Sequence, residues 1–313
     1  MMTAHNIKVS VCVVTYNQKS LVRECLESIV NQSTDFNFEV IVSDDGSTDG
    51  TQDVIQEYAN NYDFIVPVIG GANKGALKNY IETHKLARGE YVCHCDGDDL
   101  FLPGKLQSQV NFLDANPNYS ISAHAVRVIG SNEIFGNAPH LPVTATASDL
   151  VTLGTYFVHS SVMYRRSCRP VYEDGFESVD FYVHLQTALD GLIHLNKSVL
   201  GYYRKHAGGI TSNNAYREKI EKIYNSAYDM AIDNGIEFSV AKKAKVKRNF
   251  AFALSRYFDG DTEGFVKIIS LEKEDYPYSS QVHRLLYHTR NIPLVMFCLN
   301  KLRNFKKIII RSN

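Results

Sequence analysis

The feature that most constrains the fold is a fourfold alternation of strand and helix patterns within the first third or so of the 313 residues. Short apolar runs begin at Val9, Phe38, Ile65 and Tyr91, and each precedes a segment with apolar residues at helical spacing. Runs that are apolar at almost every position are typical of strands buried on both faces of a parallel sheet. The alternation therefore predicts an α/β fold with a doubly wound, mostly parallel sheet flanked by helices.

Two helix starts are predicted from capping residues. Ser20 is placed to cap the first helix, and Asp49 the second, with Gln52 three residues further on. Beyond about Ser120 the pattern mixes short strands, loops and one helix, and from about Asn214 it is mostly helical. We therefore expect a first domain over residues 1–213 and a helical region over residues 214–313.

Polar residues follow three of the four predicted strands. These clusters are 15–17 (TYN), 44–47 (DDGS) and 96–99 (DGDD). Ligands of doubly wound sheets bind at the carboxyl ends of the strands, where such clusters converge. The sequence thus predicts one polar site at one edge of the sheet.

The cluster DGDD carries three carboxylates within four residues. Their mutual repulsion is costly unless a cation or water relieves it. Mg²⁺ and Mn²⁺ favour such oxygen-rich sites and share them with substrate phosphates. The alternative is an acidic turn that caps the following helix.

The segment DDGSTDG has two interpretations. Asp45, Ser47 and Asp49 match the opening of an EF-hand calcium loop, but Gln56 stands where that loop needs its glutamate. The favoured interpretation is a strand-to-helix turn whose carboxylate binds a nucleobase. Tyr16 lies where a ring could stack on a base, although a packed tyrosine is the ordinary alternative.

Taken in order, the clusters resemble a known family. The segments VSVCVVTYN, VSDDGSTDGT, NKGALKN and ARGEYVCHCDGDDLFLPGKL resemble the ordered motifs of family 2 glycosyltransferases of the GT-A fold, over roughly Val9 to His206. A bacterial subgroup with a cysteine and G-D-D after the fourth strand, which works in surface polysaccharide synthesis, is most similar. The resemblance implies a nucleotide-sugar half at residues 1–118 and an acceptor-side half at 119–213.

The resemblance also implies the role of each donor-site position. The residues expected to bind the donor are Thr15, Tyr16, Asn17, Asp45, Gly46, Ser47, Asn73, Lys78, Asp96 and Gly97. Asp45 would bind the base, typically uracil. Lys78 stands where the family usually has an arginine near the pyrophosphate, which keeps the charge but loses the bidentate fork. Asp98 would ligate Mn²⁺ or Mg²⁺, and Asp96 the ribose or a metal-bound water.

On the acceptor side, the resemblance places the catalytic base at Asp180. The family usually has Glu-Asp there, whereas Val179 precedes the aspartate in this chain. Glu177 is the second candidate and Asp174 the third. His206, in the segment YRKH, is a candidate for the metal or for phosphate, with a structural histidine as the alternative.

The resemblance implies an inverting transfer from a nucleotide-diphosphate sugar, with a UDP-sugar as the expected donor, to a saccharide or lipid-linked saccharide. Two alternatives stay open: a nucleotidyltransferase, whose usual Gly-rich basic loop after the first strand TYNQKS does not match, and a non-catalytic nucleotide-sugar binding protein. Histidines outside the motifs, His84 among them, are interpreted as core or surface residues.

Composition limits the location and partners. The net charge of −1 argues against a nucleic-acid partner. The six cysteines form no C-x-x-C pair and are interpreted as buried thiols of a reducing compartment. The polar N-terminus predicts a cytoplasmic protein.

From Tyr276 onward there are seven basic and no acidic residues, so the amphipathic tail at 293–310 is a candidate for peripheral contact with an anionic inner-membrane face.

Overall fold

A computed structural model describes residues 7–169, 172, 176–205, 216–271 and 278–292. The chain divides into two compact units, residues 1–227 and 228–313. The expected boundary between residues 213 and 214 lies within a segment outside the described residues and stays a prediction.

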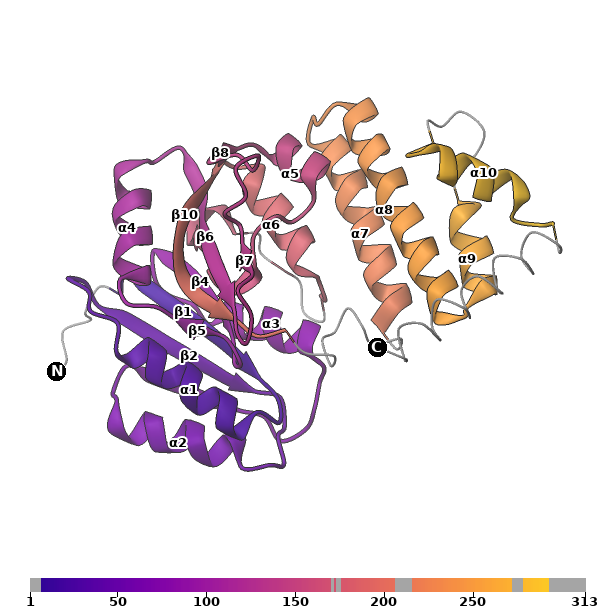
Figure 1. Cartoon of the computed structure of the whole chain (residues 1–313). Coiled ribbons are helices and arrows are strands. Elements are labelled where there is room, and N and C mark those ends of the chain that lie inside the picture. Colours follow the sequence, from indigo (N-terminus) through magenta and orange to yellow (C-terminus); the bar gives the residue numbers. More distant parts are fainter. Residues whose placement is uncertain (1–6, 170–171, 173–175, 206–215, 272–277, 293–313) are drawn as a thin grey trace. The chain divides into compact units, whose positions relative to one another are not determined.

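The first unit is built on one large mixed sheet (Figure 1). Its elements, in chain order, are β1 (Val9–Thr15), α1 (Lys19–Val30), β2 (Phe38–Asp44), α2 (Thr51–Asn61), β3 (Ile65–Ile69), α3 (Ala76–Lys85), β4 (Tyr91–Asp96), β5 (Leu100–Phe101), α4 (Lys105–Ala115), β6 (Tyr119–Val128), β7 (Ile134–Phe135), β8 (Thr144–Ala145), α5 (Ala147–Leu153), η1 (His159–Ser161), β9 (Met163–Arg165), η2 (Arg166–Cys168), α6 (Asp180–Ala188), β10 (Leu192–Tyr203) and α7 (Arg217–Asp233).

The order of strands in the sheet is β3-β2-β1-β4-β9-β6-β10-β5, with β7 on β6 and β8 on β10. Strands β3, β2, β1 and β4 are parallel, as the alternating pattern predicts. Strand β9 then pairs antiparallel with both β4 and β6, while β6 and β10 are parallel. The predicted doubly wound fold is confirmed, and the antiparallel pairs fall mainly in its second half.

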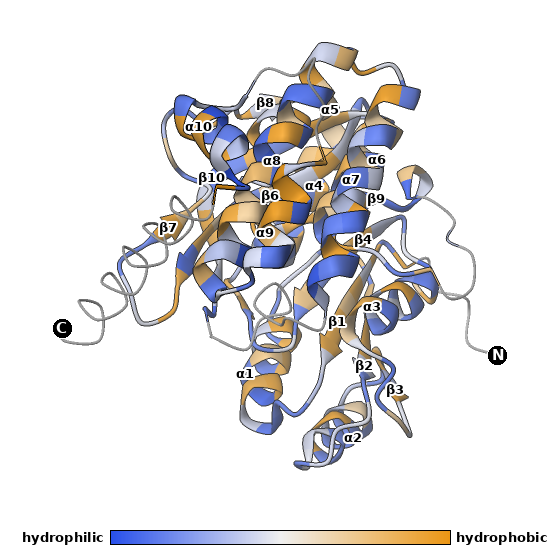
Figure 2. Cartoon of the chain, turned by 90° about the vertical axis from the view of Figure 1, so that its right-hand side faces the viewer, coloured by the Kyte–Doolittle hydropathy of each residue, from blue (hydrophilic) through white to orange (hydrophobic). Residues whose placement is uncertain are grey.

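Side chains of the central strands alternate between the two faces of the sheet. On β1, Val9, Val11 and Val13 belong to one apolar core with Leu26 and Ile29 of α1. The intervening side chains point to the face covered by α3, where the Cys12 thiol lies 4.0 Å from the carbonyl oxygen of Thr83. Figure 2 shows the apolar colour of β1 and the mixed colours of α2.

The predicted helix caps are partly wrong. Helix α1 begins at Lys19 after Gln18, which makes no side-chain cap, so Ser20 lies inside the helix. Helix α2 begins after Gly50, whose φ of 91° lies in the left-handed region that favours glycine. Asp49 still serves the first turn, because its Oδ1 accepts the N–H of Thr51 at 3.0 Å.

Most cysteines are buried thiols, as the sequence predicts. Cys12, Cys25, Cys93 and Cys95 are free and buried, and Cys168 is half-buried. The remaining cysteine, Cys298, lies outside the described residues.

The second unit is helical, as expected. It contains the end of α7, then α8 (Phe238–Asp259), α9 (Thr262–Ile269) and α10 (Gln281–Thr289). Its apolar core is formed by Ala253, Tyr257, Phe265, Ile268 and Ile269. A helix long and apolar enough to cross a bilayer is absent from the part of the chain that the structure describes. The basic tail at 293–310 lies outside that part.

Candidate active site

Two loops at the carboxyl ends of β1 and β2 hold each other. Ser47 Oγ accepts the backbone N–H of Asn17 at 2.7 Å, and Asn17 Oδ1 accepts that of Thr48 at 2.9 Å. Asn17 adopts a positive φ of 51°, which places its side chain for this exchange. Tyr16, beside it, keeps 46% of its surface exposed. The first predicted cluster thus presents an accessible aromatic ring on a tied loop.

Asp45 organises the loop before α3. Its carboxylate is buried and accepts the backbone N–H groups of Lys74 at 2.9 Å and Gly75 at 3.0 Å. The same Gly75 N–H is also accepted by Asn73 Oδ1, at 3.0 Å. Gly46 is required here, because a Cβ on it would come within 2.8 Å of the Asn73 nitrogen. The sequence predicts Asp45 as a base ligand, and the structure adds that it anchors this loop.

The carboxylates of the DGDD cluster differ in exposure. The Asp96 side chain, at the end of β4, is 43% exposed, whereas Asp98 is 5% exposed. Gly97 lies between them against β1, where a Cβ would meet the Thr15 side chain at 2.7 Å. Thr15 Oγ1 in turn donates to Gln18 Oε1 at 2.8 Å. The close approach of backbone to Thr15 explains why glycine separates the two aspartates.

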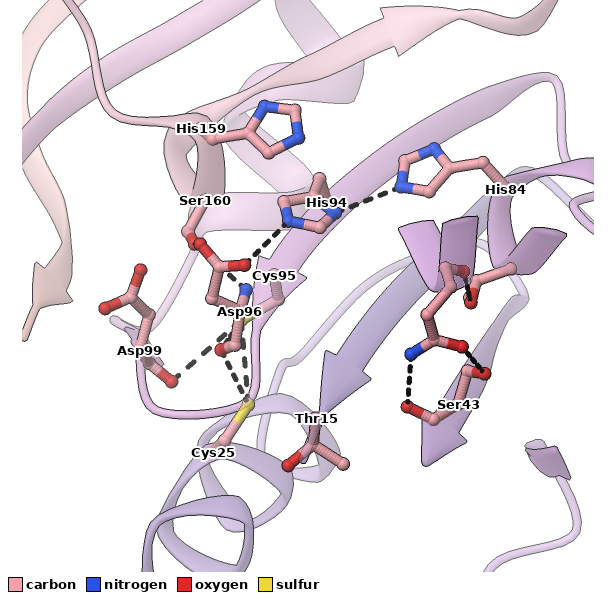
Figure 3. Close-up of polar contacts among 12 residues, drawn as sticks. Thr15, Cys25, Ser43, His84, His94, Cys95, Asp96, Asp99, His159 and Ser160 are labelled. Carbon is pink, nitrogen blue, oxygen red and sulfur yellow. Dashed lines mark hydrogen bonds and ion pairs between the residues drawn. The ribbon is translucent and has the colours of Figure 1, made fainter. Parts of the chain in front are cut away.

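Asp96 is held by one side chain of its own strand and by one from η1 (Figure 3). His94 Nε2 lies 3.2 Å from Asp96 Oδ1, and Ser160 Oγ lies 3.4 Å from Oδ2. Ser160 Oγ also accepts the backbone N–H of Asp96 at 3.0 Å. Burial lowers the pKa of His94 to about 3, so the ring is neutral.

Asp99 ties the cluster to the end of β10. Its Oδ1 accepts the backbone N–H of Arg204 at 2.9 Å, and its Oδ2 is buried without a hydrogen-bond partner in the described structure. The Arg204 guanidinium donates to the carbonyl of Asp98 at 3.1 Å and to Glu24 at 2.9 Å. Burial, and then the Asp96 charge, raise the pKa of the Asp99 carboxyl.

Tyr203, the last residue of β10, precedes Arg204 and lies within electrostatic reach of four carboxylates. Its pKa is raised first by burial and then by the charges of Asp99, Asp96, Asp98 and Asp180. These four carboxylates come from the β4–β5 turn and from the start of α6. The predicted base and the predicted metal cluster therefore face one common region.

Asp180 is the first residue of α6, after the N-cap Val179. Its Oδ1 accepts the neighbouring N–H of Phe181 at 2.8 Å, and its charge reaches His159, as that of Asp96 does. The alternative candidate Glu177 is paired with Lys219 of α7. A carboxylate engaged with an ammonium group is less available to accept a proton, and the assignment of the base to Asp180 stays a prediction.

Three other expected residues remain. Lys78 Nζ is 3.7 Å from Glu82 one turn along α3, with 41% of its side chain exposed. Its place near a pyrophosphate stays a prediction. His206 and Asp174 lie outside the described residues. Among the residues that are described, no group of three His, Cys, Asp or Glu side chains is arranged to hold a metal.

Sequence reasoning missed the buried residues behind the site. His84 and His94 are each 1% exposed and join Asp96 to the interior, yet His84 was expected to be only a core or surface residue. A local signal exists for His94 alone, because strand alternation puts residues 94 and 96 on one face. The contribution of α3 could not be predicted without the fold.

The sheet order, the two tied loops and the acidic cluster at the strand ends define a protein with a GT-A type glycosyltransferase fold. The chain belongs to glycosyl transferase family 2, whose model matches residues 10–169. This match covers the sheet from β1 to β9 and every predicted donor-site residue.

Two relatives by sequence illustrate the similarity. An uncharacterised protein of Mycobacterium tuberculosis is 36% identical over 219 residues, which are 67% of this chain and 62% of the relative. This chain thus spans about three-fifths of that relative's length. WfaP of Escherichia coli, named a UDP-Glc:α-D-GlcNAc-diphosphoundecaprenol β-1,3-glucosyltransferase, is 26% identical over 66% of this chain and 80% of its own.

A solved structure shares the fold. TarS 1–349 of Staphylococcus aureus, in complex with UDP-GlcNAc, superposes with a TM-score of 0.69 at 20% identity, covering 98% of this chain and 93% of that one. At this identity the likeness concerns the fold alone.

Proposed function

We propose that this chain is a metal-dependent, inverting glycosyltransferase that moves a sugar from a nucleotide-diphosphate sugar to a saccharide or lipid-linked saccharide. The observation that carries the proposal is that the charges of Asp96, Asp98, Asp99 and Asp180 all act on Tyr203, in a chain of this family. A direct displacement requires a donor site and a proton acceptor within reach of one another.

The donor would bind at the carboxyl edge of β1, β2 and β4. Tyr16 offers an exposed ring for stacking on a base, and Asp45 lies buried beside it on the neighbouring loop. Asp45 already accepts two N–H groups, and a carboxylate offers about four acceptor positions, so a base N–H can still be accommodated. We propose UDP as the nucleotide, in line with the UDP-linked sugars in the names of WfaP and the TarS complex.

The acidic residues fit a divalent cation. Mg²⁺ is usually held by one or two carboxylates together with substrate phosphates, which agrees with two aspartates at a strand end rather than a complete protein cage. Asp98 would be the direct ligand and Asp96 its neighbour, and His206 is proposed as a further ligand. A bound Mn²⁺ or Mg²⁺ would neutralise charge on the leaving diphosphate.

The remaining chemistry falls to Asp180. Its carboxylate would take the proton of the acceptor hydroxyl while the hydroxyl oxygen bonds to the anomeric carbon. The bond from that carbon to the diphosphate oxygen breaks in the same step, and the diphosphate leaves with the electron pair. Attack opposite the leaving group inverts the anomeric configuration, and no covalent intermediate with the protein forms.

The acceptor side is proposed from chemistry and from the relatives together. WfaP is named for a lipid diphosphate-linked sugar acceptor, and we propose an acceptor of this class, in surface polysaccharide synthesis. The proposed location is the cytoplasm, with the basic tail touching the inner membrane.

A direct assay separates an enzyme from a nucleotide-sugar binding protein. Release of UDP would be measured with a panel of UDP-sugars and saccharide acceptors, with Mn²⁺ and with the metal removed by a chelator. Acceptor-stimulated, metal-dependent release is expected. Tight binding of a UDP-sugar without release for any acceptor would favour the binding protein, and no affinity for any nucleotide sugar would refute the donor assignment.

A further inference from the structure

A line of buried polar side chains runs from the interior of the first unit to Asp96. The Tyr164 hydroxyl lies 2.6 Å from His84 Nδ1, and His84 Nε2 lies 3.0 Å from His94 Nδ1. His94 Nε2 lies 3.2 Å from Asp96 Oδ1. Figure 3 shows the last two contacts in sequence, between α3 and the end of β4.

Strand geometry produces this line. Residues 94 and 96 of β4 point to the same face because side chains alternate along a strand. That face is covered by α3, which supplies His84, while Tyr164 comes from β9, the strand that pairs with β4. Side chains of three elements therefore meet behind one carboxylate.

The chemistry of the two ends fixes the direction of every hydrogen bond. A carboxylate accepts only, so the proton between His94 and Asp96 belongs to His94 Nε2. A charged ring would be expensive at 1% exposure, so His94 Nδ1 carries no proton and accepts from His84 Nε2. His84 Nδ1 is then left as the acceptor of the Tyr164 hydroxyl. Both rings are thereby fixed as Nε2–H tautomers.

The rings have little freedom to leave this arrangement. His84, His94 and Tyr164 are each at most 2% exposed, so no solvent replaces a lost hydrogen bond. The His159 ring lies against His94, with centroids 3.9 Å apart, and the Tyr80 ring meets it edge-on at 5.1 Å. A His94 side chain held this firmly presents one N–H at one position.

We propose that Tyr164, His84 and His94 form a directional hydrogen-bond chain that fixes the orientation of the Asp96 carboxylate. The three are positioning residues, which act on the donor through Asp96, and this role rests on the proposed function of Asp96. Outer partners of this kind typically change metal affinity or activity by about 10- to 100-fold when removed.

The tautomers give a test that needs no activity. In ¹⁵N-labelled full-length protein, long-range ¹H–¹⁵N spectra of the histidine rings report which nitrogen is protonated. Both His84 and His94 are expected as neutral Nε2–H forms, and Asp96→Asn should shift the Nε2 proton of His94 more than that of His84. An Nδ1–H tautomer, or a doubly protonated His94 ring, would overturn the chain.

Two substitutions at position 94 separate positioning from packing. In His94→Gln the amide nitrogen can still donate to Asp96 while its oxygen accepts from His84, whereas His94→Leu keeps the volume apolar and removes both contacts. Mn²⁺-dependent UDP affinity, measured by calorimetry, should fall about 10- to 100-fold in His94→Leu and within about threefold in His94→Gln.

The matched control is His124, which is equally buried on β6 and whose Nδ1 lies 2.9 Å from the carbonyl of Ala125. His124→Gln and His124→Leu should leave UDP affinity unchanged. Equal UDP affinity of His94→Gln and His94→Leu in folded protein would refute positioning. A wild-type protein with no UDP affinity would refute the proposed donor instead, while the tautomers and the Asp96→Asn shift would still decide whether the chain holds Asp96.

Discussion

The two faces of the central sheet are built from different chemistry. The face covered by α1, α2 and α4 is mainly an apolar core of valine, leucine, isoleucine and cysteine side chains. Its polar exception is the buried Lys105 of α4, which donates to Cys93 Sγ at 3.0 Å and to Gln109 Oε1 at 2.9 Å. The face covered by α3 buries polar contacts as well: Ser43 Oγ with Asn79 Oδ1 at 2.6 Å, and His84 with His94 at 3.0 Å. Both faces are equally closed to water.

The difference separates the fold from the site. An apolar face needs only volume and pattern, so many side chains would serve it. A buried polar face must satisfy each donor and acceptor, which fixes a single arrangement when every partner is present. In this chain the polar face covered by α3 continues directly into Asp96 at the end of β4. The face with the stricter hydrogen-bonding requirements is therefore the one next to the proposed donor site.

A large effect is expected at Asp98, two residues beyond Asp96. Asp98→Asn keeps the shape of the side chain but removes the proposed metal ligand, so turnover should fall by about 10²–10³-fold. Mn²⁺ should then no longer improve UDP binding in calorimetry. The matched control Asp53→Asn, on the exposed side of α2, should behave as wild type. Unchanged Mn²⁺-dependent UDP affinity in Asp98→Asn would remove Asp98 from the metal site.

On the apolar face, a substitution should affect stability alone. Leu26→Ala empties a fully buried position of α1 and should cost about 2–5 kcal/mol. Urea unfolding should show the loss, while the folded protein should bind UDP with wild-type affinity. Leu86, which is 47% exposed, gives the control Leu86→Ala with little change. A large loss of UDP affinity in folded Leu26→Ala would break the distinction between the faces.

Acid should distinguish the two faces as well. Burial lowers the pKa of His184, on α6, to about 3, whereas an unfolded histidine titrates near 6.5. The unfolded chain therefore binds the proton first, and stability is lost as pH falls below about 6.5, by roughly 2 kcal/mol per such histidine at pH 5. Urea midpoints from pH 7.5 to 5 should fall less steeply for His184→Gln than for wild type. Identical slopes would mean that His184 is not buried as a neutral ring.

The sequence predicted the fold better than the site. The runs beginning at Val9, Phe38, Ile65 and Tyr91 identified the parallel strands because burial on both faces leaves a continuous apolar signal. The loop contacts could not be foreseen: Asp45 binds N–H groups of Lys74 and Gly75, about thirty residues away, and no local pattern records such a pairing.

The first residue of α1 and the hydrogen-bond partners of the buried histidines could not be predicted from the sequence either. Ser20 is a good capping residue, but Gln18 takes that position because its backbone N–H is bound by Thr51 Oγ1 at 2.9 Å. The histidine pair behind Asp96 depends on α3 crossing β4, which is decided by the whole sheet. The family motifs identified Asp96 and Asp180, and the segment around Asp96 contains His94, but they do not show that His84 and Tyr164 lie behind it.

A further expected effect concerns the C-terminal tail, which lies outside the described residues. Truncation after Tyr287 removes most of the basic residues at the C-terminal end, each worth about 1 kcal/mol near an anionic surface. Co-sedimentation with anionic liposomes at low salt should decrease, and UDP affinity should not change. Equal liposome binding by the truncated and full-length proteins would exclude the tail as a membrane contact.

The central claim, that the polar face ends in a glycosyl transfer site, is tested most directly at Asp180. Turnover of Asp180→Asn would be measured at saturating donor and acceptor, with UDP-sugar affinity in parallel and Glu177→Gln as the comparison. The account predicts a fall of about 10²–10⁴-fold in Asp180→Asn with donor affinity nearly unchanged, and a much smaller loss in Glu177→Gln. Retention of more than about a tenth of wild-type turnover by Asp180→Asn would contradict it, because a missing general base costs far more.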